Sequence, residues 1–170
     1  GSEFEQGSAY IFERNQGGTD QWQQVKKLIA SDGAGPDEFG VSVAIYGDTA
    51  IVGAFLDSVG SMFAQGSAYI FVKPGGGWAT TSAFTAKLTA SDGADYDYFG
   101  NSVALSGDTA LVGAFKEDSS KGSAYVFVKP GGGWATGIET AKLTASDGAG
   151  GDEFGDAVAI SGNTAIVGAS

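Results

Sequence analysis

One long unit occurs three times in this chain, and this repetition limits its fold more than any other feature. The phrase "GSAY" begins at Gly7, Gly66 and Gly122. Three further landmarks recur at nearly the same intervals: a Phe-Gly pair, a tryptophan, and the phrase "IVGA" or "LVGA". Because four independent landmarks agree, the sequence predicts three copies of one structural unit of roughly 55 to 60 residues.

Each unit contains four short apolar runs, which the middle unit shows most clearly. "GSAYIFVK" (66–73) is continuously apolar and predicts a strand buried on both faces. "FTAKLTAS" (84–91) alternates with period two and predicts a half-exposed outer strand. "NSVALSG" (101–107) and "TALVGAF" (109–115) are joined at a Gly-Asp pair that favours a tight hairpin turn. No segment shows a helical period, so we expect almost no helix.

Four antiparallel strands per unit, repeated along the chain, are typical of a β-propeller blade. A β-sandwich rarely repeats its own sequence at so long a period, and a β-solenoid uses shorter coils. The predicted fold is therefore all-β, a β-propeller built of four-stranded antiparallel blades with three repeats per chain. The repeats occupy 7–170, in units of about 7–54, 66–114 and 122–169. Residues 1–6 are a lead-in whose "GSEF" start has the character of a cloning scar.

Three stretches carry a resemblance to a known family. "FGVSVAIYGDTAIVGA" (39–54), "FGNSVALSGDTALVGA" (99–114) and "FGDAVAISGNTAIVGA" (154–169) resemble FG-GAP repeats, the blade motifs of the integrin α-chain propeller and of many bacterial surface proteins. The proline that closes the family motif is absent from all three. The resemblance implies a non-catalytic recognition or adhesion module of a secreted or cell-surface protein.

Many FG-GAP repeats carry a calcium loop between the first two strands of a blade. Here that place holds only the tight turns at Gly47, Gly107 and Gly162. Because a two-residue turn cannot surround Ca²⁺ with six to eight oxygens, this metal site is not expected here.

In the strand order of the family, an acidic phrase connects the outer strand of one blade to the inner strand of the next. Its copies are "SDGAGPDEFG" (31–40), "SDGADYDYFG" (91–100) and "SDGAGGDEFG" (146–155). Asp-Gly suits a turn, and the Phe would anchor the arriving strand between blades. Clustered carboxylates on a flexible loop also suit Ca²⁺, so calcium is a candidate cofactor. The candidate ligands are Asp32, Asp37, Glu38, Asp92, Asp95, Asp97, Asp147, Asp152 and Glu153.

The loops between the second and third strands lie on the same face as the acidic phrases and differ between units. Variable loops on a rigid scaffold are the usual place for binding, so this is the expected ligand face. Candidate contact residues are Asp57, Phe63, Glu117 and Asp118. Met62 and Phe63 are unusually apolar for such a loop, and either contact a ligand or pack against the blade.

Trp22, Trp78 and Trp134 begin the predicted outer strands, once in each unit. As stacking platforms they would make the chain a carbohydrate-binding propeller, which is the alternative function. As packing residues they would cover the rim of each blade or fill the space between blades.

Charge and composition exclude several classes of function. Acidic residues outnumber basic ones 20 to 9, a net charge of -11, which argues against nucleic acid and anionic membranes as partners. No apolar run approaches the roughly 18 residues of a membrane helix, so no membrane insertion is expected. Histidine and cysteine are absent, and the acids repeat with the blades instead of converging once, so no enzyme is expected. The partners that remain are an unknown protein or glycan ligand and a second copy of the chain.

The strand count predicts the assembly. In family order, the sequence holds third and outer strands, two whole blades, and then inner and second strands. Closure within one chain would give three blades, fewer than the four to eight of propellers. Two chains arranged head to tail would complete each other's half-blades, so we expect a homodimer that forms a six-bladed ring. The alternative is a fragment of a longer propeller.

Overall fold

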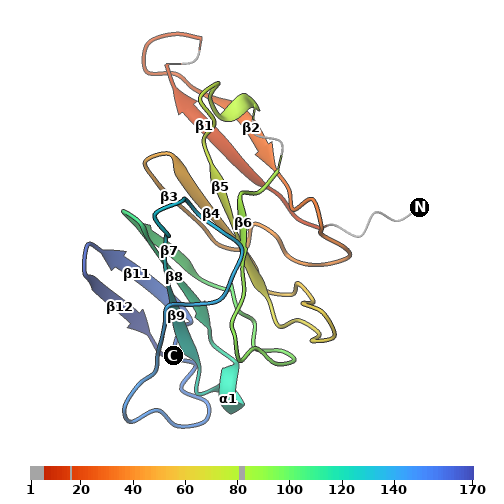
Figure 1. Cartoon of the computed structure of the whole chain (residues 1–170), viewed down its shortest axis with the longest axis vertical. Helices are drawn as coiled ribbons and strands as arrows, with labels where there is room; N and C mark the ends of the chain where they lie inside the picture. The colour runs from red at the N-terminus through yellow and green to blue at the C-terminus, as the bar shows by residue number, and fades with distance from the viewer. Residues whose placement is uncertain (1–5, 16, 81–82) are drawn as a thin grey trace.

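The computed structural model describes residues 6–15, 17–80 and 83–170, and its regular secondary structure consists almost entirely of antiparallel strands (Figure 1). The predicted scar at residues 1–4 lies outside the described residues. Two sheets are complete, with orders β3-β4-β5-β6 and β10-β9-β8-β7. The strands of the first are β3 (Val43–Tyr46), β4 (Thr49–Ala54), β5 (Ser67–Val72) and β6 (Ala86–Leu88). Those of the second are β7 (Val103–Ser106), β8 (Thr109–Ala114), β9 (Ser123–Val128) and β10 (Ala141–Leu143).

Two further sheets have only two strands each and lie at the two ends of the molecule (Figure 1). β1 (Ala9–Arg14) pairs with β2 (Trp22–Leu28), which correspond to the third and outer strands of a blade. β11 (Ala157–Ser161) pairs with β12 (Thr164–Gly168), which correspond to the inner and second strands. The all-β class and the four-stranded antiparallel blades are thus confirmed, with two complete blades between two half-blades.

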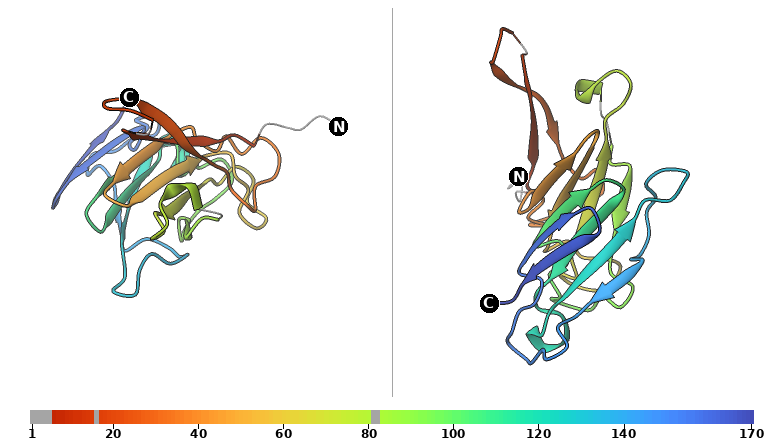
Figure 2. Two further views of the ribbon diagram at one scale, coloured as in Figure 1. Left: turned by 90° about the horizontal axis from the view of Figure 1, so that it is seen from above. Right: turned by 90° about the vertical axis from the view of Figure 1, so that its left-hand side faces the viewer.

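The blades stack face to face, and each acidic phrase leads from one blade to the next (Figure 2). A parallel bridge marks every junction, joining the glycine before a third strand to the phenylalanine of the following phrase. These bridges are Gly7–Phe39, Gly66–Phe99 and Gly122–Phe154. The repeated phrase therefore recurs because every junction between blades needs the same crossing.

The core lies between the stacked sheets. β5 is buried along its length except at Val72, as its continuous apolar run predicts. The ring of Phe99 is fully buried and meets Tyr125 and Phe127 edge-on, with ring centroids 5.4 and 5.9 Å apart. Phe39 makes the equivalent contacts in the blade before it. Phe39 and Phe99 therefore anchor the arriving strands, as expected, whereas Phe154, before the C-terminal half-blade, is only partly buried.

The tryptophans differ from the expectation that each begins an outer strand. Trp22 does begin β2 and is exposed. Trp78 lies in a short 3-10 turn, η1 (Trp78–Thr80), and Trp134 lies in the connection before β10. Both are buried, because the chain folds back over the blade before it forms the outer strand.

Helix is limited to η1 and to α1 (Glu117–Ser120) in the described part of the chain. Asp118 and Ser119 have φ values of 47° and 61°, so α1 is an irregular turn at the start of the β8–β9 loop. None of the described helical segments has the length and apolar character needed to cross a bilayer.

Candidate functional site

The aspartate two residues before each Phe-Gly pair shapes the acidic phrase. Its Oδ2 accepts a hydrogen bond from the amide three residues earlier, and the donor and acceptor atoms lie 2.8, 2.6 and 2.7 Å apart in the three copies. The pairs are Ala34–Asp37, Ala94–Asp97 and Ala149–Asp152. Asp37 and Asp97 are buried, and burial raises the pKa of both carboxyls above its usual value. These aspartates hold the turn that precedes the inner strand.

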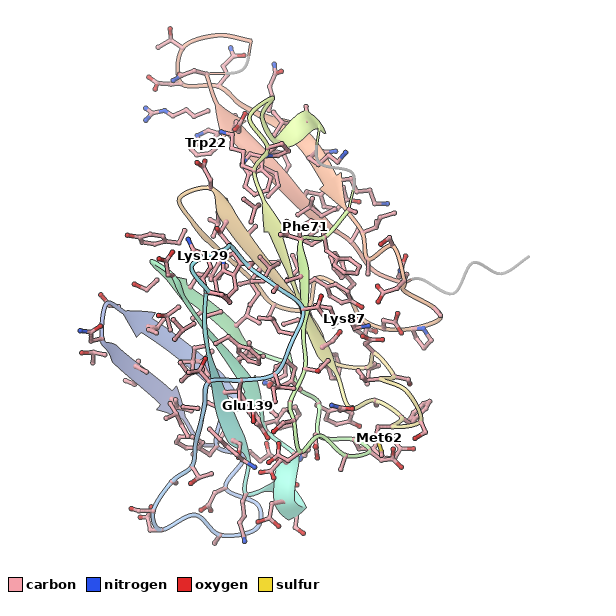
Figure 3. The ribbon with its side chains drawn as sticks, in the orientation of Figure 1. Trp22, Met62, Phe71, Lys87, Lys129 and Glu139 are labelled. Atoms are coloured by element: carbon pink, nitrogen blue, oxygen red, sulfur yellow. The ribbon has the colours of Figure 1, made fainter. Side chains whose placement is uncertain are left out.

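The first aspartate of a phrase pairs with a lysine on the outer strand of the following blade. Lys87 Nζ lies 2.9 Å from Asp32 Oδ2 and 2.7 Å from Asp57 Oδ2, and it is labelled in Figure 3. Asp57 is buried and also accepts hydrogen bonds from the hydroxyls of Ser67 and Tyr69. Burial alone would lower the pKa of Lys87, but its bonds to Asp57, Tyr69 and Asp32 outweigh burial and raise it.

The next blade repeats this arrangement, with Glu117 in the place of Asp57. Lys142 Nζ lies 2.6 Å from Asp92 Oδ2 and 2.8 Å from Glu117 Oε1. Burial alone would raise the pKa of Asp92, but hydrogen bonds from Lys142 and Tyr125 lower it overall. A lysine held by two carboxylates, one from the preceding phrase and one from the loop after the second strand, therefore fastens each complete blade to its neighbour.

The remaining acids of the phrases have separate surroundings. Asp95 accepts a hydrogen bond from the Phe63 amide at 2.7 Å, Glu153 pairs with Lys116, and Glu38 is exposed. Within the described ranges, no three acidic side chains form a group that could hold a metal ion. The acidic phrases thus serve as turns and ion-pair partners, and this donor set does not fit Ca²⁺. Calcium binding is therefore a prediction from the sequence alone, and the engagement of these carboxylates within the chain argues against it.

An aromatic cluster lies on the expected ligand face. It consists of Phe55, Phe63, Tyr96, Tyr98 and Phe115. Phe63 and Tyr96 are 58% and 52% exposed, and their ring centroids lie 5.4 Å apart. Tyr98 lies beneath them, with its ring centroid 5.3 Å from Phe55 and 5.6 Å from Phe115. The cluster offers two exposed rings on a partly buried aromatic base.

Backbone bonds fix the exposed pair. The β4–β5 loop (55–66) runs beside the second acidic phrase, where the Tyr96 amide donates to the Phe63 carbonyl at 2.9 Å and the Tyr98 amide to the Ala64 carbonyl at 3.3 Å. Met62, half exposed in this loop, is labelled in Figure 3. The rings are therefore held by two segments that are distant in the sequence.

The predicted contact residues fall into two groups. Phe63 and Asp118 are exposed on the ligand face, and Asp118 pairs with Lys121. Asp57 and Glu117 are tied to the lysines described above, so their carboxylates are engaged within the chain.

Sequence reasoning missed Tyr96 and Tyr98. Both interrupt the repeated phrase, because the corresponding positions hold Pro36 and Glu38 in the first copy and Gly151 and Glu153 in the third. This departure from the repeat is the signal that would have found them.

Comparison with known families agrees with this architecture. The sequence matches the FG-GAP repeat family over residues 22–71, 83–127 and 138–170. No curated protein matches the chain significantly. The three matched segments each contain a Phe-Gly pair and the strands that follow it.

Proposed function

The chain belongs to the FG-GAP repeat family, and from this premise we propose that it is a non-catalytic recognition module that binds an extracellular or cell-surface ligand through its aromatic cluster. Secretion or surface display and a role in adhesion are part of this proposal. The family match supports a ligand-binding repeat scaffold, and the exposed rings of the aromatic cluster support its choice as the binding site.

The observation that carries the proposal is that, among the described residues, the exposed Phe63–Tyr96 pair occurs in one blade junction only. Residues that serve the fold recur in every copy, as the phrase aspartates do. A binding site needs unlike residues that converge once, and exposed aromatic rings on a rigid base are frequent anchors for protein ligands. Binding would lose little conformational entropy at Phe63 and Tyr96, because backbone hydrogen bonds already join the two segments that carry them.

A glycan ligand is the second candidate. The buried Trp78 and Trp134 cannot stack on a sugar, whereas Trp22 and Tyr96 are among the exposed aromatic rings that can. Trp22 begins the outer strand β2 and is not part of the aromatic cluster. Substituting Trp22 alone therefore distinguishes a glycan bound there from a protein bound at the cluster.

The test is binding of the full chain to immobilised extracellular-matrix proteins and to a glycan array. We expect binding to a protein probe that weakens at least tenfold in the Phe63→Ala/Tyr96→Ala variant. The matched control is Ile138→Ala, which removes a similarly exposed apolar side chain from the β9–β10 connection. Equal binding by the double variant would contradict the assignment of the site. Glycan binding that is lost in Trp22→Ala would favour the second candidate.

A further inference from the structure

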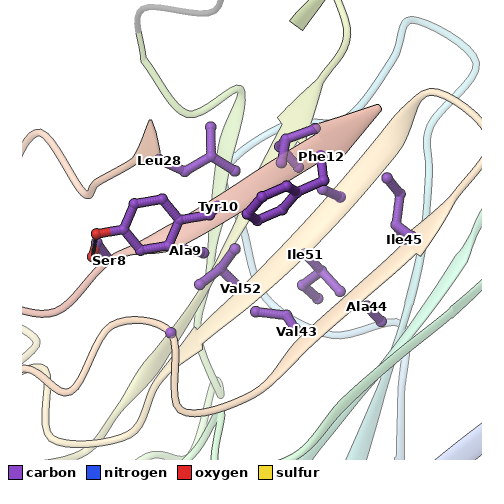
Figure 4. A pocket seen from close by; sticks show the side chains of 13 residues that line it. Ser8, Ala9, Tyr10, Phe12, Leu28, Val43, Ala44, Ile45, Ile51 and Val52 are labelled. Atoms are coloured by element: carbon purple, nitrogen blue, oxygen red, sulfur yellow. Dashed lines mark hydrogen bonds between the residues drawn. The ribbon is translucent and has the colours of Figure 1, made fainter. Parts of the chain in front are cut away.

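An apolar groove runs along the N-terminal half-blade, beside β1 (Figure 4). Its volume is about 540 Å³, and β1, β3 and β4 line it. Val43 on β3 is 60% exposed in this groove, whereas its counterpart Val103 on β7 is 9% exposed because the preceding blade covers it. In the described part of the chain, β1 also pairs on one side only, with β2, so its other edge has unpaired backbone groups. Such an edge beside an apolar surface favours the addition of strands.

We propose that this groove binds the β11–β12 hairpin of a second copy of the chain, and that reciprocal insertion closes a six-bladed ring. The hairpin has the sequence that occupies the corresponding place in a complete blade. Residues 164–169 read "TAIVGA", identical to residues 49–54 in β4. In this structure one face of the β11–β12 hairpin packs on the second complete blade, and the opposite face of the hairpin is uncovered.

The complete blades give the register of the inserted hairpin. β4 pairs with β5 so that Ile51 lies opposite Ile70 and Val52 opposite Tyr69. By the repeat, Ile166 of one copy would lie opposite Ile11 of the other, and Val167 opposite Tyr10. Ile166 and Tyr10 are both exposed in the single chain. The inserted hairpin would bury both side chains, Ile166 on one face of the completed blade and Tyr10 on the other.

Three equivalent glycines distinguish the two filled junctions from the unfilled one. A Cβ atom on Gly53 would lie 1.9 Å from the carbonyl oxygen of Gly100 in the next blade, and one on Gly113 would lie 2.0 Å from that of Gly155. The corresponding Gly168 has no such neighbour among the described residues, and a Cβ there would meet only Ala157 of its own hairpin, at 3.4 Å. Gly168 is therefore suited to a close contact that is absent in the single chain, and the contacting carbonyl would be that of Gly40 in the second copy.

Two charged residues without an ion pair in the described ranges of the single chain also indicate a second copy as the partner. Asp32 pairs with Lys87 of the next blade, and Asp92 pairs with Lys142. Lys27 and Asp147 occupy the corresponding positions in the first and third copies. In the described part of the chain, Lys27 contacts the Tyr10 ring but has no carboxylate partner, and Asp147 is exposed with no ion pair. In the ring, Lys27 of each copy would meet Asp147 of the other.

The first test is the molar mass of the full chain by light scattering across a range of dilutions. We expect one species at twice 17.1 kDa. Gly168→Ala should give a folded monomer, because the added methyl group has room in the single chain and none in the junction. Gly132→Ala is the control, since a Cβ there meets nothing within 4 Å, and it should remain a dimer. A wild-type monomer at all dilutions, open-ended oligomers, or a dimer that Gly168→Ala leaves intact would each overturn the proposal.

Charge reversal supplies a second test that specifies the partner. Lys27→Asp and Asp147→Lys should each weaken self-association about tenfold or more, because both junctions of the homodimer then place like charges together. An equimolar mixture should recover the dimer, since one junction then joins the introduced aspartate to the introduced lysine and the other keeps the original pair. Failure of the mixture to recover the dimer would contradict the proposed contact, whereas binding through the aromatic cluster is measured separately and is unaffected by this outcome.

Discussion

The same six residues, "TAIVGA", occur in β4 and again at the C-terminal half-blade, with opposite surroundings. Ile51 in β4 is completely buried, whereas Ile166 in β12 is 71% exposed. Both strands form a hairpin with the strand before them. The difference arises because β4 also pairs with β5 and is covered on both faces, while β12 has neither a third strand nor a following blade in the described chain. The local sequence therefore determines the strand, and the neighbouring blade determines whether the strand is buried.

The lysines of the outer strands also differ between a complete blade and a half-blade, and their substitution has the largest expected effect on the free energy of unfolding. Lys87→Met leaves the buried carboxylate of Asp57 without its cation, which typically costs about 3–5 kcal/mol for a buried pair. In the Gly168→Ala background, where exchange is blocked, Lys27→Met at the corresponding exposed position should cost under about 1 kcal/mol. Urea unfolding of both variants beside the wild type measures the two values. Similar losses in both would show that the half-blade and the complete blade do not differ as described.

The two isoleucines give a second comparison, with the same chemical change at both places. Ile51→Ala should destabilise the chain by about 2–5 kcal/mol at every protein concentration, because it opens a cavity in the core between blades. Ile166→Ala should have little effect on the dilute chain and should lower stability only at concentrations where the dimer forms. Denaturation curves at several concentrations distinguish the two, and a concentration-independent loss in Ile166→Ala would contradict the exchange.

Much of the fold could be predicted from the sequence because the blade is encoded locally. The Gly-Asp turn, the alternating "FTAKLTAS" and the continuous "GSAYIFVK" each specify a strand or hairpin, and the repeat supports each one. Their pairing order follows from the family and agrees with the structure. The buried Trp78 and Trp134 could not be placed as well, because their position depends on how a long connection folds back over the blade.

The candidate site was less predictable than the fold. Phe63 stood out as an apolar residue in a variable loop, but its neighbour Tyr96 comes from a different phrase, and only the tertiary structure brings the two together. Asp57 was assigned to the ligand face from its loop position. Its burial against Lys87 depends on the outer strand of the blade, which no local pattern reports.

The pH dependence of stability gives a smaller difference between a complete blade and a half-blade. The pKa of Asp92 is lowered in the folded chain, so its contribution to stability is present above the ordinary value of about 3.8 and is lost as the pH falls through the folded value. The stability gap between wild type and Asp92→Asn should therefore be constant near neutral pH and shrink below about pH 4. In the Gly168→Ala background, Asp147→Asn should show no gap, because Asp147 has no partner when exchange is blocked. A gap of equal size at Asp147 would contradict the comparison.

Calcium gives the smallest expected effect. Because the phrase carboxylates are engaged by amides and lysines, we expect no rise in melting temperature when millimolar CaCl₂ is added. If calcium does bind, the rise should disappear in the combined Asp37→Ala, Asp97→Ala and Asp152→Ala variant. Magnesium at the same concentration is the control for ionic strength.

The most direct test of the central claim is a disulfide across the proposed junction. The chain has no cysteine, so Ile11→Cys with Ile166→Cys introduces the only two thiols. Residues directly opposite in an antiparallel pair have Cβ atoms about 4.5–5.5 Å apart, close to the spacing a disulfide needs. On mild oxidation, we expect the double variant to become a covalent dimer on a non-reducing gel, and neither single variant to cross-link. An oxidised monomer with an internal disulfide, or no cross-link at all, would contradict the exchange of half-blades between two chains.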